Sequence, residues 1–145
     1  MIIVLFGQPN SGKTTLADAL LEQNKFTDYK HVDGDQLRNI FKNKDFSKEG
    51  RIKNLNRASD IATYLDAVSG GVILSLVYPY KEARDYLESL SDNVKWIYLT
   101  YSEKRGSENF HVEDFEAPVG MNFMSLNTSE LTITNCIKLI NLYVG

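Results

Sequence analysis

The sequence has few of the residues that form disulfides, span a membrane or bind nucleic acid. Its 145 residues include one cysteine, so no disulfide can form within the chain, and the cytoplasm is the expected compartment. No apolar run is long enough to cross a membrane, and the opening run lacks the basic flank and cleavage site of a secretory signal. A formal net charge of −3 provides no cationic field, which disfavours nucleic acid as a partner.

The remaining composition is that of one globular domain over residues 1–145. Hydrophobic residues make up 43% of the chain, which is enough to bury one core. Apolar runs predict strands over 2–6, 31–33, 72–77 and 94–99, with an edge strand over 122–127. Apolar residues at helical spacing predict helices over 13–24, 36–43, 48–69, 81–90 and 130–143. Asp35 is the expected cap of the second helix, and Thr128 or Ser129 that of the last.

The alternation of strands and helices predicts an α/β fold of three layers, in which a parallel sheet is flanked by helices on both faces. In such a fold, ligands bind at the carboxyl ends of the strands. Functional residues are therefore expected in four places, namely the loop after the first strand, residues 33–38, residues 77–81 and the segment after Leu99.

The strongest motif is a phosphate-binding loop directly after the first strand. A buried strand, a glycine-containing turn and a helix that opens at Lys13 form the context in which backbone N–H groups point at phosphate oxygens. Lys13 would bridge the β- and γ-phosphates, the Thr14 hydroxyl would ligate Mg²⁺, and the helix dipole would favour the anion. ATP and Mg²⁺ are thus the predicted cofactors of a P-loop NTPase fold. The predicted nucleotide-binding residues are Gly7, Gln8, Pro9, Asn10, Ser11, Gly12, Lys13, Thr14 and Thr15.

Two aspartates follow the second predicted strand. Asp35 can accept the proton of an attacking hydroxyl, and it can also organise the water shell of a Mg²⁺ ion held by Thr14. Asp33 is expected to support Asp35. The simpler alternative is that Asp35 only caps a helix. The phosphate loop favours the first interpretation, with Asp35 and Lys13 as the catalytic residues.

Several further blocks, in order along most of the chain, make the sequence similar to the adenylylsulfate kinases. The blocks are His31–Arg38, Phe46-Ser47 with Arg51, Asn54 and Arg57, Tyr78–Lys81 with Arg84-Asp85, Phe115–Pro118, and Leu126–Thr128. The resemblance implies phosphorylation of the 3′-hydroxyl of adenosine 5′-phosphosulfate (APS), a small-molecule substrate, to give PAPS. It thus implies a role in sulfate assimilation.

The acceptor side of the site is predicted on the helices that follow the second strand. Arg38, Arg51 and Asn54 could clamp the phosphosulfate and the ribose, because guanidinium forks suit an oxyanion. A solvated charged face is the ordinary alternative, and we expect it for Arg57. Phe46 either stacks on the acceptor adenine, as the resemblance implies, or packs as a lid on the core.

The segment after the third strand is expected to complete the acceptor pocket. Its predicted members are Val77, Tyr78, Tyr80 and Lys81. The resembling family usually has Ser and Arg in place of Tyr78 and Lys81, so these acceptor contacts are changed. Arg84 and Asp85 are expected only to form a salt bridge on their helix.

The resemblance is weakest after Leu99. The family has a longer mobile lid after this strand. The corresponding segment here, residues 100–112, is shorter and lacks the family's pattern of Lys, Gly and Tyr. A closed lid excludes water and completes the charge around the transferring group, so the short segment is expected to affect rate or substrate retention. Arg105 is the predicted lid cation, with Lys104 as its rival. Pro118 is predicted to form part of the adenine slot for ATP or to be structural.

Two other functions stay open at the level of the sequence. One is a small kinase that acts on a nucleoside, a nucleotide or a polynucleotide end through the same loop. The other is a nucleotide-binding module that has lost transfer, of which the short lid would be a symptom. Asp35 argues against the module, and Phe46, Arg51 and Asn54 argue against the other acceptors. A homodimer is also left open.

Overall fold

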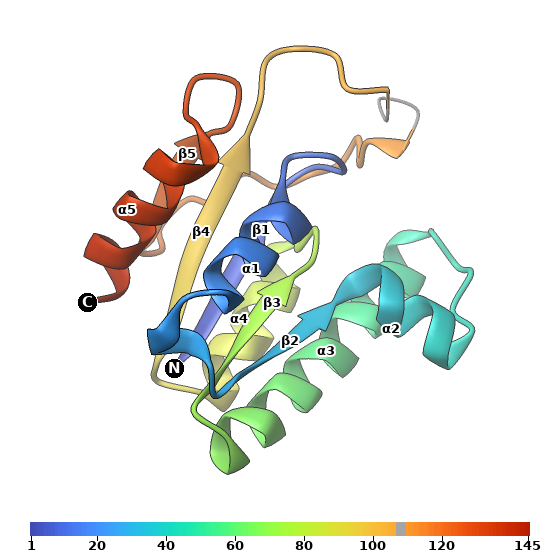
Figure 1. The fold of residues 1–145 in the computed structure, drawn as a ribbon. Helices are drawn as coiled ribbons and strands as arrows, with labels where there is room; N and C mark the ends of the chain where they lie inside the picture. Colours follow the sequence, from blue (N-terminus) through green and yellow to red (C-terminus); the bar gives the residue numbers. More distant parts are fainter. Residues whose placement is uncertain (107–109) are drawn as a thin grey trace.

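A five-stranded parallel sheet runs through the centre of the molecule, with helices on both faces (Figure 1). The structure, a computed structural model, describes residues 1–106 and 110–145. The strand order is β2-β3-β1-β4-β5, and each neighbouring pair is parallel. The strands are β1 (Ile2–Phe6), β2 (Tyr29–Asp33), β3 (Gly71–Ser75), β4 (Val94–Thr100) and β5 (Phe123–Asn127). The predicted α/β fold with a parallel sheet is therefore confirmed.

The side chains of the central strand β1 alternate between two cores, which explains its unbroken apolar run. Ile2, Val4 and Phe6 face one helical layer, while Ile3 and Leu5 face the other, and all five are fully buried. The first layer consists of α2 (Gly34–Phe41), α3 (Lys48–Val68) and α4 (Lys81–Leu90). The second consists of α1 (Lys13–Leu21) and α5 (Ile133–Val144), with the short 3-10 turn η1 (Asn24–Phe26) after α1.

Two of the predicted helix caps are wrong. Asp33, rather than Asp35, caps α2, because its carboxylate accepts hydrogen bonds from the backbone N–H groups of Asp35 and Gln36. The last helix starts later than expected and is capped by Thr132, whose hydroxyl accepts from the N–H of Asn135. The earlier candidates, Thr128 and Ser129, belong instead to the turn that follows β5.

Strand β3 ends two residues before its predicted boundary. The backbone N–H of Leu76 still donates to the carbonyl of Leu5, but Tyr78 then adopts a φ of 43° and Pro79 follows it. Such a left-handed turn cannot continue a strand. The chain therefore leaves the sheet and enters α4.

The topology brings the carboxyl ends of β1, β2, β3 and β4 to one edge of the sheet. Gly7 allows the turn there, since its φ is 149° and an added Cβ would lie 2.3 Å from the carbonyl oxygen of Leu99. The loops after these strands carry the predicted functional residues (Figure 1). No helix in the described ranges is both long and apolar enough to cross a membrane.

Candidate active site

The phosphate loop lies between β1 and α1, with Lys13 folded back over it. The Lys13 ammonium donates to the carbonyls of Gly7 at 3.2 Å and Gln8 at 2.8 Å, and to the hydroxyl of Ser11 at 3.4 Å. Burial lowers the pKa of Lys13 from 10.5 to about 8, although the negative charges of Asp35 and Asp33 oppose the shift. A bound phosphate would replace these carbonyl partners and favour the charged ammonium.

The carboxylate of Asp33 joins three elements of the site. Its Oδ1 accepts from the hydroxyls of Thr14 at 3.1 Å and Ser75 at 2.9 Å. Its Oδ2 accepts from the N–H groups of Asp35 and Gln36, both at 3.1 Å. A carboxylate offers about four acceptor positions, so these four bonds fill them. The carboxylate of Asp35, two residues beyond the cap, is the one that this network leaves for chemistry.

The donor set beside the loop fits Mg²⁺ that arrives with a nucleotide. The Thr14 hydroxyl is a hard oxygen ligand, and because its hydrogen is donated to Asp33 at 3.1 Å, its lone pairs remain for a metal ion. Within the described residues, no cluster of three or more His, Cys, Asp or Glu could hold a metal by itself. The structure places Asp33 against Thr14, and the metal role of Asp35 stays a prediction.

A single cavity of about 920 Å³ connects the phosphate loop with the acceptor side. This volume lies at the upper end of the range for small-molecule sites. The cavity brings together most of the predicted site residues: Pro9, Asn10, Gly12, Lys13, Thr14, Thr15, Asp33, Asp35, Arg38, Phe46, Arg51, Asn54, Val77 and Arg105. Gly7, Gln8 and Ser11 belong to the loop backbone behind it. Nothing in the sequence pointed to five further lining residues, Leu55, Ser75, Leu76, Phe110 and His111.

The acceptor wall is formed by an exposed aromatic ring and two arginines. Phe46 is 60% exposed, and the guanidinium carbons of Arg38 and Arg51 lie 4.2 and 5.8 Å from its ring centroid. Arg38 Nη1 also donates to the carbonyls of Asn43 and Asp45 and to the Asn43 side chain, which holds the loop that presents Phe46. Arg38 therefore has a structural task besides any contact with an anion. Burial and the positive charge of Arg51 lower the pKa of Arg38.

Asn54 presents an unused hydrogen-bond acceptor to the cavity. The residue is 4% exposed, and its Nδ2 donates to the carbonyl of Gly34 at 3.5 Å. Among the residues that the structure describes, its buried Oδ1 has no hydrogen-bond partner. Buried polar atoms in proteins are nearly always paired, so this oxygen points to a ligand that supplies an O–H or N–H.

Four predicted site residues, Tyr78, Tyr80, Lys81 and Pro118, are not among the residues that line this cavity, and their binding roles stay predictions. Tyr78 is fully buried, hydrogen-bonds Ser59 through its hydroxyl and packs edge-on against Trp96, so burial raises its pKa. Tyr80 is 2% exposed and donates to Asp114.

The helix α4 also differs from the expected salt bridge. Lys81, rather than Arg84, forms an ion pair with Asp85, at 2.6 Å. Arg84 is 3% exposed, and its Nη1 donates to the carbonyl of Tyr78 at 2.8 Å. This buried bond stabilises the left-handed turn that redirects the chain after β3.

The segment after β4 is attached to the phosphate loop at three consecutive positions. The Gln8 amide forms two bonds with the backbone of Val112, at 2.9 and 2.8 Å. The Tyr101 hydroxyl donates to the carbonyl of Pro9 at 2.7 Å. Asn10 Nδ2 donates to the carbonyl of Arg105, and Arg105 Nη1 donates to the carbonyl of Asn10.

Of the two candidate lid cations, the structure favours Arg105. Arg105 lines the cavity and also pairs with Glu103, whereas Lys104 is exposed and is not among the lining residues. Residues 107–109 of the predicted lid lie outside the described residues.

Comparisons with known proteins agree with this geometry. The family model of adenylylsulphate kinase matches residues 1–105. The chain is 34% identical to the cytidine diphosphoramidate kinase of Campylobacter jejuni over 101 residues, which cover 68% of this chain and 59% of that protein. It is 34% identical to a probable adenylyl-sulfate kinase of Pseudomonas aeruginosa over 96 residues, which cover 64% of this chain and 45% of that protein. The chain spans about half the length of the curated relatives it matches.

Solved structures show the same fold. The APS kinase of Mycobacterium tuberculosis, solved in complex with AMPPNP and APS, superposes with a TM-score of 0.81 at 16% identity, over 99% of this chain and 96% of that one. A gluconokinase from Sinorhizobium meliloti superposes with a TM-score of 0.68 at 15% identity, over 97% of this chain and 92% of that one. Given the family match over residues 1–105, the chain belongs to the adenylylsulphate kinase family.

Proposed function

We propose that the protein transfers the γ-phosphoryl group of ATP to the 3′-hydroxyl of APS, giving PAPS and ADP. The observation that carries the proposal is the continuity of the cavity, which joins the phosphate loop to Phe46, Arg51 and Asn54 and is also lined by Asp35. A phosphotransferase needs this arrangement, because donor and acceptor must meet in one water-poor space. The family match supports the same reaction.

On the donor side, Lys13 leaves its carbonyl partners and binds the β- and γ-phosphates as an ammonium. Thr14 is the residue that would hold Mg²⁺, with its hydroxyl hydrogen donated to Asp33; the ion, when bound, would neutralise part of the phosphate charge. Arg105 adds a guanidinium from the lid, held in place by its bond to the carbonyl of Asn10. Together these groups stabilise the charge that is spread over the transferring oxygens.

On the acceptor side, Phe46 stacks on the adenine, and Arg51 binds the phosphosulfate. The unpaired Oδ1 of Asn54 accepts a ribose hydroxyl, which fixes the orientation of the sugar. A bond forms between the ribose 3′-oxygen and the γ-phosphorus, while the bond from that phosphorus to the oxygen of ADP breaks. The proton of the 3′-hydroxyl passes to Asp35, because the four acceptor positions of Asp33 are already used.

A second candidate is the same transfer to another acceptor. It is supported by the Campylobacter jejuni relative, whose name gives cytidine diphosphoramidate as its substrate. An aromatic ring and a guanidinium bind any nucleobase and any phosphoryl anion, so Phe46 and Arg51 alone do not select adenine.

The test is an ADP-release assay with ATP, Mg²⁺ and one acceptor at a time, with the products identified by mass spectrometry. APS, cytidine diphosphoramidate, gluconate and thymidine are the acceptors to compare, with Lys13→Ala as the inactive control. We expect a 3′-phosphorylated product from APS. Turnover of another acceptor with none of APS would overturn the proposal and leave the kinase assignment intact. Binding of both nucleotides without any transfer would indicate a nucleotide-binding module.

A further inference from the structure

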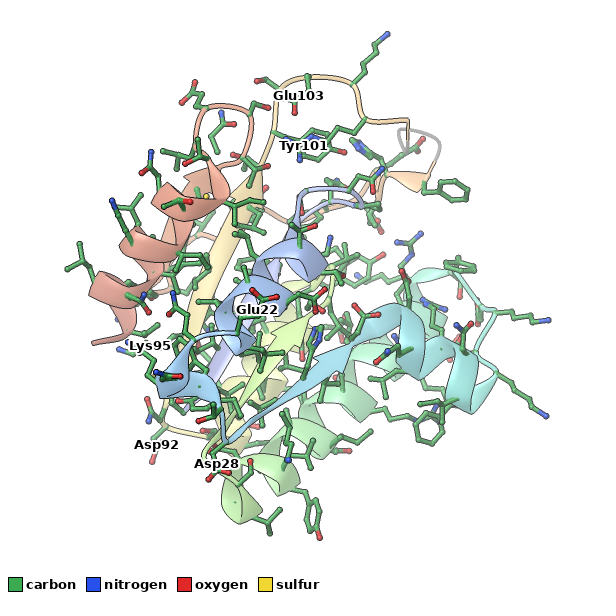
Figure 2. All side chains as sticks on the ribbon, viewed as in Figure 1. Glu22, Asp28, Asp92, Lys95, Tyr101 and Glu103 are labelled. Carbon is green, nitrogen blue, oxygen red and sulfur yellow. The ribbon has the colours of Figure 1, made fainter. Side chains whose placement is uncertain are left out.

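The lid places an imidazole in the cavity that the sequence did not single out. His111 lines the cavity together with Lys13, Asp35 and Arg105. Its Nε2 lies 2.8 Å from the hydroxyl oxygen of Tyr101, and the two rings pack edge-on with centroids 6.1 Å apart. Figure 2 shows Tyr101 on the segment after β4, above the loop that follows β1. The imidazole is therefore fixed relative to the phosphate loop.

The hydrogen bonds define which nitrogen of His111 carries a proton. Tyr101 has one hydroxyl hydrogen, which it donates to the carbonyl of Pro9 at 2.7 Å. The Tyr101 oxygen must then accept, and His111 Nε2–H is the donor at 2.8 Å. The other nitrogen, Nδ1, has no hydrogen-bond partner among the residues that the structure describes. A neutral His111 thus offers a lone pair at Nδ1, and a protonated His111 offers a second N–H.

This arrangement suits an anion better than it suits a neutral ligand. The phosphate loop, Arg105 and Lys13 already make the same part of the cavity a site for phosphoryl oxygens. The lid residues after the grey segment lie beside the loop that follows β1, on the side that faces α2 (Figure 1). Because Nε2 is used by Tyr101, Nδ1 is the ring nitrogen left for a phosphoryl group in the cavity that His111 lines, and only a protonated ring can donate from it.

We propose that His111 is a phosphoryl-binding residue of this site, whose protonated ring, held through Nε2–H by Tyr101, donates Nδ1–H to an anionic phosphoryl oxygen. The kinase assignment under Proposed function supplies the two sources of that oxygen, the γ-phosphate of the nucleotide and the phosphosulfate of the acceptor. His111 thereby adds a second hydrogen-bond donor from the lid beside the guanidinium of Arg105.

Other charged groups share the cavity and determine how the test must be made. Lys13 faces it from α1, Asp33 and Asp35 from the start of α2, Arg38 and Arg51 from the acceptor wall, and Arg105 from the lid itself. Lys13 has a pKa of about 8 and titrates in the range of interest. Only the difference between the native protein and a His111 variant at each pH isolates the imidazole.

Two substitutions separate the two ring nitrogens. His111→Gln keeps an N–H near the Nε2 position, which can still reach Tyr101, but it has no donor near Nδ1. His111→Asn keeps an N–H near the Nδ1 position and loses the bond to Tyr101. Calorimetric titration with AMPPNP and Mg²⁺, and separately with APS in the presence of ADP, is made at pH 6 and pH 8. Thermal unfolding of each variant accompanies the titrations.

We expect His111→Gln to bind one of the two ligands roughly five- to tenfold more weakly than the native protein at pH 6, and by a smaller factor at pH 8. His111→Asn should bind more tightly than His111→Gln at pH 6. A loss confined to AMPPNP identifies the nucleotide as the source of the oxygen, and a loss confined to APS identifies the acceptor. Unchanged affinities would overturn the proposal. Tyr101→Phe, titrated in the same way, is the structural control: a pH-independent loss of affinity that it shares with both His111 variants would also overturn the proposal. The AMPPNP titration needs no acceptor, so absent APS turnover refutes the proposed function without affecting this test.

Discussion

Replacement of Lys13 by methionine should make the ligand-free protein more stable while it abolishes phosphoryl transfer. The ammonium is held over the loop by two carbonyls and a hydroxyl, and burial lowers its pKa from 10.5 to about 8. The difference corresponds to about 3 kcal/mol of unfavourable free energy at neutral pH, at 1.36 kcal/mol for each pKa unit. Methionine keeps the volume but leaves the carbonyls of Gly7 and Gln8 unpaired, at a cost of about 1 kcal/mol each, so we expect a net gain of about 1 kcal/mol.

The pH dependence of this gain follows from the direction of the shift. Below pH 8 the Lys13 ammonium is charged in both the folded and the unfolded chain, and the full penalty of burying it is present. Between pH 8 and 10.5 the folded protein loses the proton while the unfolded chain keeps it, so the stability of the native protein rises. The advantage of Lys13→Met is therefore largest at pH 7 and disappears as the pH approaches 10.5.

The assay is thermal or urea unfolding of both proteins at pH 7, 8, 9 and 10, without nucleotide. A gain of 1 kcal/mol corresponds to roughly 3 °C in Tm for a chain of this length. Lys30→Met, an exposed lysine on β2, is the matched control and should show no pH-dependent gain. A Lys13→Met protein that is less stable at pH 7, or whose advantage is the same at every pH, would refute the reasoning.

Three further predictions address the other parts of the site. Asp35→Asn should lower kcat roughly 100-fold and leave the Kd for AMPPNP nearly unchanged; a parallel loss of both would make Asp35 a nucleotide or metal residue. Arg51→Ala should raise the KM for APS about ten- to hundredfold with little change for ATP, and Phe46→Ala should do the same through lost stacking. If neither acceptor constant moves in steady-state kinetics, the acceptor binds elsewhere. Gln8→Leu should speed hydrogen exchange at the amide of Val112 and weaken nucleotide binding, whereas unaltered exchange would show that the lid is held by other contacts.

The fold followed from the sequence because its signals are local. The strand at 2–6 is an unbroken apolar run that is buried on both faces, and the long helix after Ser47 carries a regular apolar stripe and a capping serine. The position of the site at one edge of the sheet followed from topology alone, since all parallel strands end there.

The sequence-based predictions were wrong where two nearby residues of the same type could both cap a helix, or where contacts with other elements set the direction of a side chain. Judged from the sequence alone, Asp33 and Asp35 are equally good helix caps. Which of them caps α2 depends on whether Gly34 belongs to the helix, as it does in the structure. The side chain of Tyr78 points into the core because the residue adopts a left-handed φ, which Ser59 and Arg84 support through contacts far along the chain. No local pattern indicates such a turn at a tyrosine.

The attachment of the lid could not be predicted either, because it joins residues about a hundred positions apart. Gln8 and Asn10 occupy the variable positions of the phosphate loop, where the motif specifies no side chain. In this protein they hold Val112 and Arg105, and Pro9 between them accepts from Tyr101. The loop that binds phosphate and the segment that covers it therefore form one hydrogen-bonded unit. A change at Gln8 or Asn10 should then weaken nucleotide binding even though Lys13 and Thr14 are intact, because these hydrogen bonds support the proposal that the short segment after β4 serves as a lid.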